Sequence, residues 1–410
     1  MLSLSRFLIL FIVFYAFIYA DEYHYKNIPV GGRGGYMGGA YTGVSDDPTG
    51  CFYNPAGIVY ASGRSLSLSG NVYSISEKRY HEPIQGIDGK TYDWILKSSK
   101  LSPSFFGLID EIGKFKVCFS YAVPDYTFRD QHQIFYNIRS IFPDNPISNY
   151  VIDIYDADNT YLIGPSIAYA LNDKFSIGLT LYLHYRSMDI IRNHLLRFAK
   201  GESVQANYRQ SLEEIGIKPI LGIMFTPFPK FSTGLKISKN FIVYNEGYRQ
   251  GMASPIGLPG GFEYSYTEEK TPRKTPMEYT LGFAWFPSSS LLFAFDIDYF
   301  PKPSKEYIDV YNFSFGTEIY LRDDIAIRLG AYTDFANTPP LSPDRINQPE
   351  KLDIYGISFG VSYFTFSSEI TAGIGYQFGN GYAQVITNNP SIQKVSYTNL
   401  ILSLSTVYNY

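Results

Sequence analysis

Two stretches of the chain have the spacing of reactive motifs, and both fail once their surroundings are considered. Gly356-Ile357-Ser358-Phe359-Gly360 has the spacing of the serine-hydrolase nucleophile elbow, but that motif needs a strand that turns directly into a helix. Here it lies in the middle of a predicted strand, at 352–365. The glycine-rich run 31–39 contains Gly32-Arg33-Gly34, yet Met37 stands where a dinucleotide fingerprint has its third glycine, and no phosphate-loop lysine follows.

The histidines and the overall charge suggest no other chemistry. The five histidines lack metal-ligand spacing; they are His24, His81, His132, His184 and His194. The net charge of −4, with no basic block, gives no reason to expect nucleic-acid binding. We therefore expect a protein that is not an enzyme, that uses no cofactor or metal, and whose function depends on how its strands position binding groups.

Those strands are indicated by alternation, which is clearest at the C-terminus. Leu400, Leu402 and Leu404 share one face of an extended chain, and Asn399, Ser403 and Ser405 share the other. One face suits lipid and the opposite face suits a polar lumen. A soluble sandwich can also alternate, but its outward face would carry Lys and Glu rather than Gly and Ser. Aromatic residues make up 17% of the chain, with 38 Tyr and 31 Phe, as expected for girdles at two membrane interfaces.

The same alternation predicts fourteen strands, an even number as in bacterial single-chain barrels. They are 66–76, 103–109, 114–123, 159–171, 174–188, 213–226, 231–244, 277–286, 290–300, 308–321, 325–335, 352–365, 369–379 and 395–410. Short turns alternate without a break with connections that are mostly longer, at 77–102, 124–158, 189–212, 245–276, 301–307, 336–351 and 380–394. Outer-membrane barrels have this asymmetry of periplasmic turns and outer loops. Both chain ends are then expected on the short-turn side.

The first residues predict export. Arg6, the apolar run Phe7–Phe17 and Ala20 before Asp21 have the layout of a signal peptide, at 1–20. A membrane anchor is the competing interpretation, but the apolar run of about 14 residues is short for a helix that needs about 20. After it, no stretch approaches the length of a membrane helix. A membrane location for the rest of the chain therefore requires a closed barrel, at 65–410.

Residues 21–64 do not alternate and are rich in glycine, which predicts an ordered plug inside a barrel too wide for side chains to fill. The alternative is a disordered linker, but this segment carries more aromatic and apolar residues than a linker needs. Its motif resembles the N-terminal signature of the FadL/TodX outer-membrane transporters for long-chain fatty acids and hydrocarbons. Tyr36 replaces the first glycine of the family pattern. The matching residues are Gly38, Gly39, Ala40, Asp46, Asp47, Asn54, Pro55, Ala56 and Gly57.

The resemblance implies an outer-membrane channel that takes up hydrophobic small molecules passively. Ligand would be captured by outer loops, would pass a plug, or hatch, and would leave sideways near a kinked third strand, here 114–123 ending at Pro124. Ending on Tyr410, the last strand resembles the signal recognised by the barrel assembly machinery, and outer-membrane lipids would surround the barrel. The family signature is shared with relatives that shuttle proteins in type IX secretion. A protein-binding barrel and a general porin therefore remain alternatives.

Strand parity also predicts which charges face the lumen. Candidate ligand-binding cations are Lys116, Arg186, Lys218, Lys236 and Arg328. A cation in a dry pocket can hold a carboxylate headgroup. The alternative is that inward charges satisfy one another and the plug backbone.

The two cysteines, Cys51 in the plug and Cys118 on the inward parity of strand 114–123, can meet in the lumen. The oxidising periplasm would permit a disulfide between them. The alternative is two separate small apolar residues.

Overall fold

The computed structural model describes residues 23–410 except residues 141, 387 and 388. The expected signal peptide, 1–20, lies outside the described residues. Within the described part, no helix is long and apolar enough to cross a membrane. The helices found there are three short N-terminal segments, α2 (Arg33–Tyr36), α3 (Gly50–Tyr53) and the 3-10 helix η1 (Pro55–Tyr60).

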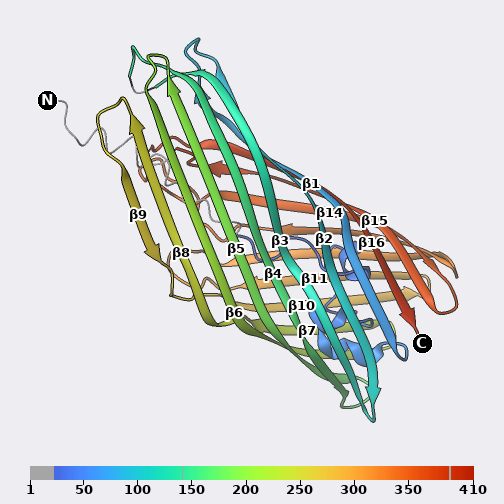
Figure 1. The fold of residues 1–410 in the computed structure, drawn as a ribbon. Coiled ribbons are helices and arrows are strands. Elements are labelled where there is room, and N and C mark those ends of the chain that lie inside the picture. The colour runs from blue at the N-terminus through green and yellow to red at the C-terminus, as the bar shows by residue number, and fades with distance from the viewer. Residues whose placement is uncertain (1–22, 141, 387–388) are drawn as a thin grey trace.

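The rest of the described chain forms one antiparallel sheet that closes into a barrel (Figure 1). Neighbours in sequence are neighbours in the sheet almost throughout, and β16 pairs with β1 to close it. The strands are β1 (Ser65–Gln85), β2 (Thr91–Ile112), β3 (Phe115–Ile138), β4 (Ile147–Ala170), β5 (Phe175–Phe198), β6 (Ser203–Phe228), β7 (Phe231–Lys239), β8 (Phe241–Ile256), β9 (Glu263–Glu268), β10 (Met277–Ser288), β11 (Leu291–Phe300), β12 (Val310–Arg322), β13 (Ile325–Asp334), β14 (Lys351–Phe364), β15 (Ser368–Ala383) and β16 (Gln393–Asn409).

The barrel has 14 crossing strands, which confirms the predicted fold. β7 and β8 are two parts of one crossing, because both pair with β6 and only Asn240 separates them. β9 is an addition that pairs with β8.

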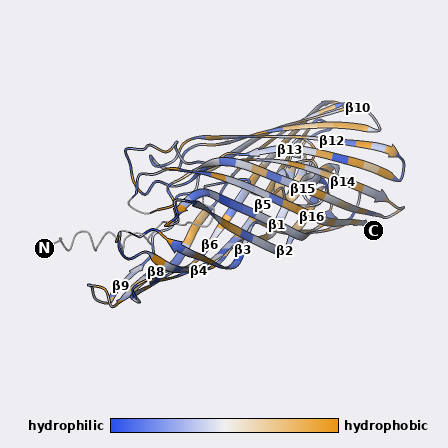
Figure 2. Cartoon of the chain, turned by 90° about the horizontal axis from the view of Figure 1, so that it is seen from above, coloured by the Kyte–Doolittle hydropathy of each residue, from blue (hydrophilic) through white to orange (hydrophobic). Residues whose placement is uncertain are grey.

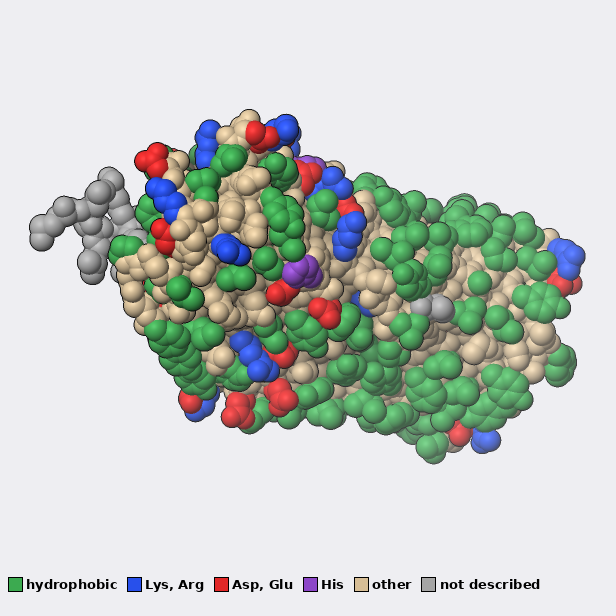
Figure 3. Space-filling view, turned by 45° about the horizontal axis from the view of Figure 1, so that its top comes forward, with side chains coloured by type: hydrophobic (Ala, Val, Ile, Leu, Met, Phe, Trp, Pro, Cys, Tyr) green, Lys and Arg blue, Asp and Glu red, His purple; other side chains and the backbone are tan. Residues whose placement is uncertain are grey.

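Side chains alternate between the lumen and the outer surface along each strand. On β5, Phe175 and Leu183 are 39% and 49% exposed on the outside, whereas the intervening Ser176 and Thr180 are fully buried. Apolar side chains cover the part of the barrel near the short turns, and charged ones gather toward the loop end (Figures 2 and 3). Such an apolar outer surface on a closed barrel is that of a membrane-spanning protein.

Stacked aromatic side chains mark the two edges of this apolar belt. On the loop side, Tyr161 stacks between Tyr121 and Tyr185, with ring centroids 6.2 Å apart in each pair. On the turn side, Phe175 stacks on Phe225 at 4.4 Å. Tyr rings with an apolar body and a polar tip suit the membrane–water interface. We call the first row, Tyr121, Tyr161 and Tyr185, the outer girdle.

Several strands run far beyond the outer girdle, which corrects the expected loops. Much of 124–158 and 189–212 is strand, because β3 continues to Ile138 and β5 to Phe198. Likewise, 245–276 contains the end of β8 and all of β9. The sequence pattern missed these extensions because their outward residues, such as Asp189 and Arg209, are polar and the lipid-facing row is lost.

Candidate functional site: two cavities beside the N-terminal segment

The N-terminal segment passes through the barrel from the loop end to the turn end. The carbonyl of Tyr23 accepts a hydrogen bond from Asn337 N in a loop-side connection, at 2.9 Å, and His24 Nε2 lies 2.7 Å from the carbonyl of Leu352, near the start of β14. The segment ends at Ser65, where β1 begins on the turn side. Residue 23 therefore lies on the loop side, and the expectation that both ends lie on the turn side is wrong. Strand parity says nothing about the direction of a segment without strands.

Glycines on the inner wall make room for this segment. They form cross-strand pairs, among them Gly178–Gly222, Gly234–Gly282 and Gly316–Gly330. A Cβ atom added at Gly316 would stand 2.6 Å from the carbonyl oxygen of Met37. The backbone of the segment thus lies directly on the backbone of the wall, which only glycine permits.

The residues of the glycine-rich motif make these close contacts. Gly38 and Gly39 have φ angles of +67° and +80°, which other residues rarely adopt. Ala40 is fully buried. The Asn54 side chain accepts a hydrogen bond from Ala56 N at 3.1 Å, which starts η1 at Pro55, and its amide donates to the carbonyls of Thr42 and Ile223. A Cβ at Gly57 would stand 2.6 Å from the Ser45 carbonyl oxygen.

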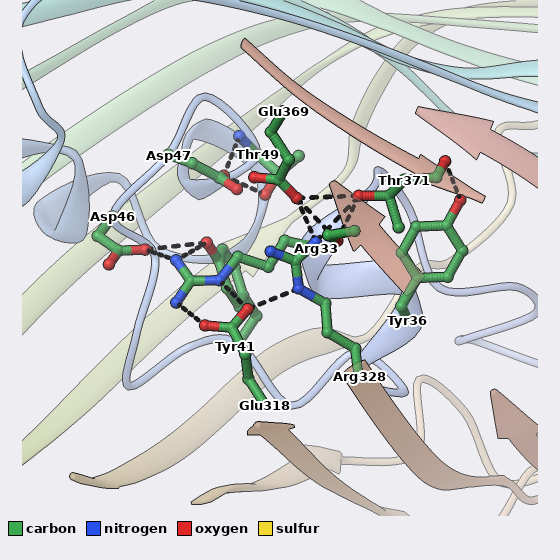
Figure 4. A network of polar contacts seen from close by, with 11 residues as sticks. Arg33, Tyr36, Tyr41, Asp46, Asp47, Thr49, Glu318, Arg328, Glu369 and Thr371 are labelled. Atoms are coloured by element: carbon green, nitrogen blue, oxygen red, sulfur yellow. Dashed lines mark hydrogen bonds and ion pairs between the residues drawn. The ribbon is translucent and has the colours of Figure 1, made fainter. Parts of the chain in front are cut away.

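A buried ion network joins the same segment to the wall (Figure 4). Arg33 of α2 donates to both oxygens of Glu318 at 2.8 Å and lies 2.5 Å from Asp46. Arg328 of β13 pairs with Glu318 at 2.6 Å and with Glu369. Burial disfavours the charged form of Arg33, but the carboxylates of Asp46 and Glu318 outweigh it and hold the pKa of its guanidinium well above the usual value.

The second acid of the motif has a local role. Asp47 accepts a hydrogen bond from Thr49 N at 2.8 Å, immediately before α3. Burial raises the pKa of the Asp47 carboxyl, and Arg33 opposes that rise. Both acids of the predicted pair therefore contribute to the shape of the N-terminal segment.

A disulfide joins Cys51 of α3 to Cys118 of β3, across 67 residues of sequence. It ties the N-terminal segment to the third strand of the barrel.

We predict that this bond is present in the purified protein. Maleimide should label neither cysteine in the unfolded protein before reduction and both afterwards, as read by intact mass. Labelling of both thiols without a reductant would contradict the bond, and a Cys51→Ser/Cys118→Ser variant provides the unlabelled control.

The first cavity, of about 690 Å³, lies between the N-terminal segment and the wall. Lys218 and Lys236 line it and share one carboxylate, Glu278, which is 3.3 Å from Lys218 Nζ. Both ammonium groups also lie over the ring of Phe52, at 5.9 and 6.0 Å from its centroid. Two lysines and one glutamate leave this cluster with a net positive charge.

The other three candidate cations are engaged elsewhere. Lys116 donates to the carbonyls of Ala61 and Gly63 near the turn end. Arg186 makes a bidentate pair with Asp158, at 2.8 Å for each bond, and Arg328 belongs to the ion network. These three ion pairs and carbonyl contacts fit the structural alternative.

Sequence reasoning missed two residues of the first cavity. Glu278 lies inside the predicted strand 277–286 on the inward parity, so alternation could have identified it. Lys26, which pairs with Asp298, comes from a segment without periodicity and gave no signal.

A second cavity, of about 770 Å³, lies in the part of the barrel nearer the loops. Ile28, Pro124 and the connection between β11 and β12 line both cavities and separate them. Lys305, Glu306 and Tyr307 are the residues of that connection that face both spaces.

Next to the second cavity, the wall of the barrel has a slit between β2 and β3. Their ladder ends at the pair Phe105–Ala122, beside the outer girdle, and an isolated bridge between Gly86 and Ile138 closes the far end. Between these points β2 pairs with β1 and β3 with β4. Pro124, which has no N–H to donate, stands where the ladder stops. The sequence placed the interruption of the third strand correctly.

The features together define a class: a membrane-spanning β-barrel whose N-terminal segment fills part of the lumen. No family model matches the sequence, and no curated protein matches it. Among solved structures, a Pseudomonas aeruginosa FadL homologue has a TM-score of 0.67 at 14% identity, over 93% of this chain and 99% of that chain. The Pseudomonas putida toluene transporter TodX has a TM-score of 0.63 at 14% identity, over 95% and 99%.

A third structure, the CymD monoaromatic hydrocarbon channel, has a TM-score of 0.64 at 14% identity, over 94% of this chain and 99% of that chain. The fold is therefore that of the FadL/TodX-type outer-membrane channels, as the glycine-rich motif indicated. These relatives are described as transporters and channels, not as enzymes.

Proposed function

We propose that the protein is an outer-membrane channel for passive uptake of hydrophobic small molecules, either long-chain fatty acids or hydrocarbons. The observation that carries the proposal is the first cavity, enclosed between the N-terminal segment and the barrel wall. Its volume of about 690 Å³ is in the range of ligand pockets, roughly 300–1,000 Å³. Support comes from relatives named as toluene and monoaromatic hydrocarbon transporters.

In this proposal the N-terminal segment acts as a hatch. Exposed apolar residues of β8 and the connection after it, such as Met252, Ile256 and Phe262, would capture the ligand on the loop side. It would pass into the cavities, and the slit between β2 and β3 would release it sideways toward the bilayer. No chemical step is involved, so movement follows the concentration gradient.

A direct test is to extract the purified protein with organic solvent and identify the bound molecules. Long-chain acids or hydrocarbons in proportion to the protein would support uptake. Co-purifying proteins in their place would favour the protein-binding alternative, and large ion conductance in planar bilayers would favour a porin.

We predict that the first cavity prefers ligands with a carboxylate. Lys218→Met removes the net positive charge and leaves Glu278 paired with Lys236. A charge-assisted hydrogen bond contributes about 1.5–3 kcal/mol. The affinity for a long-chain carboxylate should therefore fall roughly 10- to 100-fold, while the affinity for the alkane of equal length should stay the same.

The matched control is Lys239→Met, because Lys239 lines the same cavity outside this cluster and lies over the Phe241 ring. It should leave carboxylate binding, measured by calorimetry, near the wild-type value. Equal losses in both variants, or an equal loss for the alkane, would contradict a carboxylate position at Lys218.

A further inference from the structure

The second cavity has a lining of different chemistry from the first. Amide and hydroxyl side chains of several elements face it, among them Ser98, Gln348, Gln384 and Asn399. Such groups both donate and accept hydrogen bonds. Charged residues here are matched with partners: Lys78 lies 2.8 Å from Glu350, and Arg129 lies 2.6 Å from Asp156. The cavity therefore favours a neutral polar ligand over an anion.

An aromatic wall completes the cavity. Trp94 and Tyr80 both line it, with their ring centroids 5.3 Å apart. Trp94 is 9% exposed, and among the described residues its Nε1 has no hydrogen-bond partner. The Nε atom of Arg129, another lining residue, also lacks one there. Buried donors without a partner are rare in proteins, so a missing acceptor is expected at such positions.

Flat rings, amides and unsatisfied donors together match the chemistry of a sugar. The hydroxyl groups of a sugar accept and donate hydrogen bonds, and its C–H face packs on aromatic rings. A volume of about 770 Å³ is large enough for a ligand of drug size, since such pockets measure roughly 300–1,000 Å³.

The slit gives this cavity a route to the membrane. Side chains cross the slit in place of a backbone ladder: Ser98 donates to the Phe128 carbonyl, Lys100 to the Tyr126 carbonyl, and Gln131 Nε2 to the Ile95 carbonyl at 2.6 Å. Ser98, Lys100 and Tyr126 also line the cavity. Because the slit starts beside the outer girdle, an alkyl chain that left the cavity through it would enter the outer edge of the bilayer.

We propose that the second cavity binds the neutral sugar head of an amphiphile, a glycolipid or alkyl glycoside, whose alkyl chain passes through the slit between β2 and β3. This site is separate from the carboxylate position in the first cavity and does not depend on that position carrying ligand. It adds a second class of ligand to the proposed channel.

The two tryptophans of the chain provide a matched test. Trp285 lies in the aromatic row on the lipid-facing surface, stacked on Phe293 at 5.8 Å, so Trp285→Phe leaves Trp94 as the single reporter. In nanodiscs of this variant, n-octyl β-D-glucoside should change the Trp94 emission saturably. Free glucose should act only at much higher concentration, and octanoate and 1-octanol should have no saturable effect.

Calorimetry then tests the Nε1 donor itself. Trp94→Phe keeps an aromatic ring beside Tyr80 but removes the N–H, and it should weaken octyl glucoside binding roughly threefold to tenfold. Trp285→Phe should bind like the wild type. Lys218→Met should also bind the glucoside normally, so a failure of the carboxylate proposal would not affect this one.

Three results would overturn the sugar proposal: no saturable response to the glucoside, an equal response to octanoate, or equal affinity of Trp94→Phe and Trp285→Phe. Equal responses to glucose and to the glucoside would assign the cavity to a free sugar and would overturn the role of the slit.

Discussion

Replacing Arg328 with methionine is expected to destabilise the folded barrel by about 3–5 kcal/mol. Arg328 is fully buried and pairs with Glu318 and Glu369. Without it, the Glu369 carboxylate loses its ion pair, and Glu318 keeps only Arg33. A buried charge without a partner costs far more than a deleted surface pair, because water cannot reach it. Guanidinium unfolding of the protein in detergent micelles measures the effect.

The adjacent hairpin offers the control. Arg322 of β12 forms an ion pair with Asp324 in which the side chains are 65% and 36% exposed. Arg322→Met should leave the unfolding midpoint nearly unchanged, because solvent already screens that pair. Adding Glu369→Gln to Arg328→Met should recover part of the loss, since it removes the stranded carboxylate. Equal midpoints for Arg328→Met and Arg322→Met would show that the buried network contributes nothing measurable.

Alternation was sufficient to predict the barrel because the lipid belt imposes one rule on every strand. Residues such as Leu181 must face hydrocarbon, and their neighbours, such as Thr180, must face the interior. The same rule gave the inward parity of Lys218, Lys236 and Arg328. It failed above the outer girdle, where water replaces lipid and an outward Asp189 is as acceptable as a leucine.

The partners of the inward charges were beyond the reach of the sequence. Arg33 and Lys26 belong to a segment with no period, so nothing in their spacing indicates that they meet Glu318 and Asp298. The glycines of the wall carried more information than we drew from them. Cross-strand glycine pairs, such as Gly316–Gly330, mark where another backbone approaches, but they become visible only after the strand register is known.

Those glycines lead to the second large expected effect: Gly330→Ala should dislodge the middle of the N-terminal segment. An added Cβ would clash with the backbone of Gly38 and Met37, and neither partner can rotate away as a side chain would. Overpacking of this kind costs about 1–3 kcal/mol. The strand pairs of β13 remain available, so the barrel should persist while residues near Met37 lose their seat.

If the N-terminal segment is a hatch, Gly330→Ala should raise conductance in planar bilayers and expose the segment to protease. Gly375→Ala is the matched control, because Gly375 also faces the lumen but a Cβ there would meet nothing nearer than Ile401, at 3.6 Å. That variant should behave like the wild type. The disulfide at Cys51 should confine the displacement to residues before it, so reduction should increase the conductance of Gly330→Ala further. Equal conductance in the two glycine variants would contradict the hatch, since only one of them disturbs the segment that is meant to close the lumen.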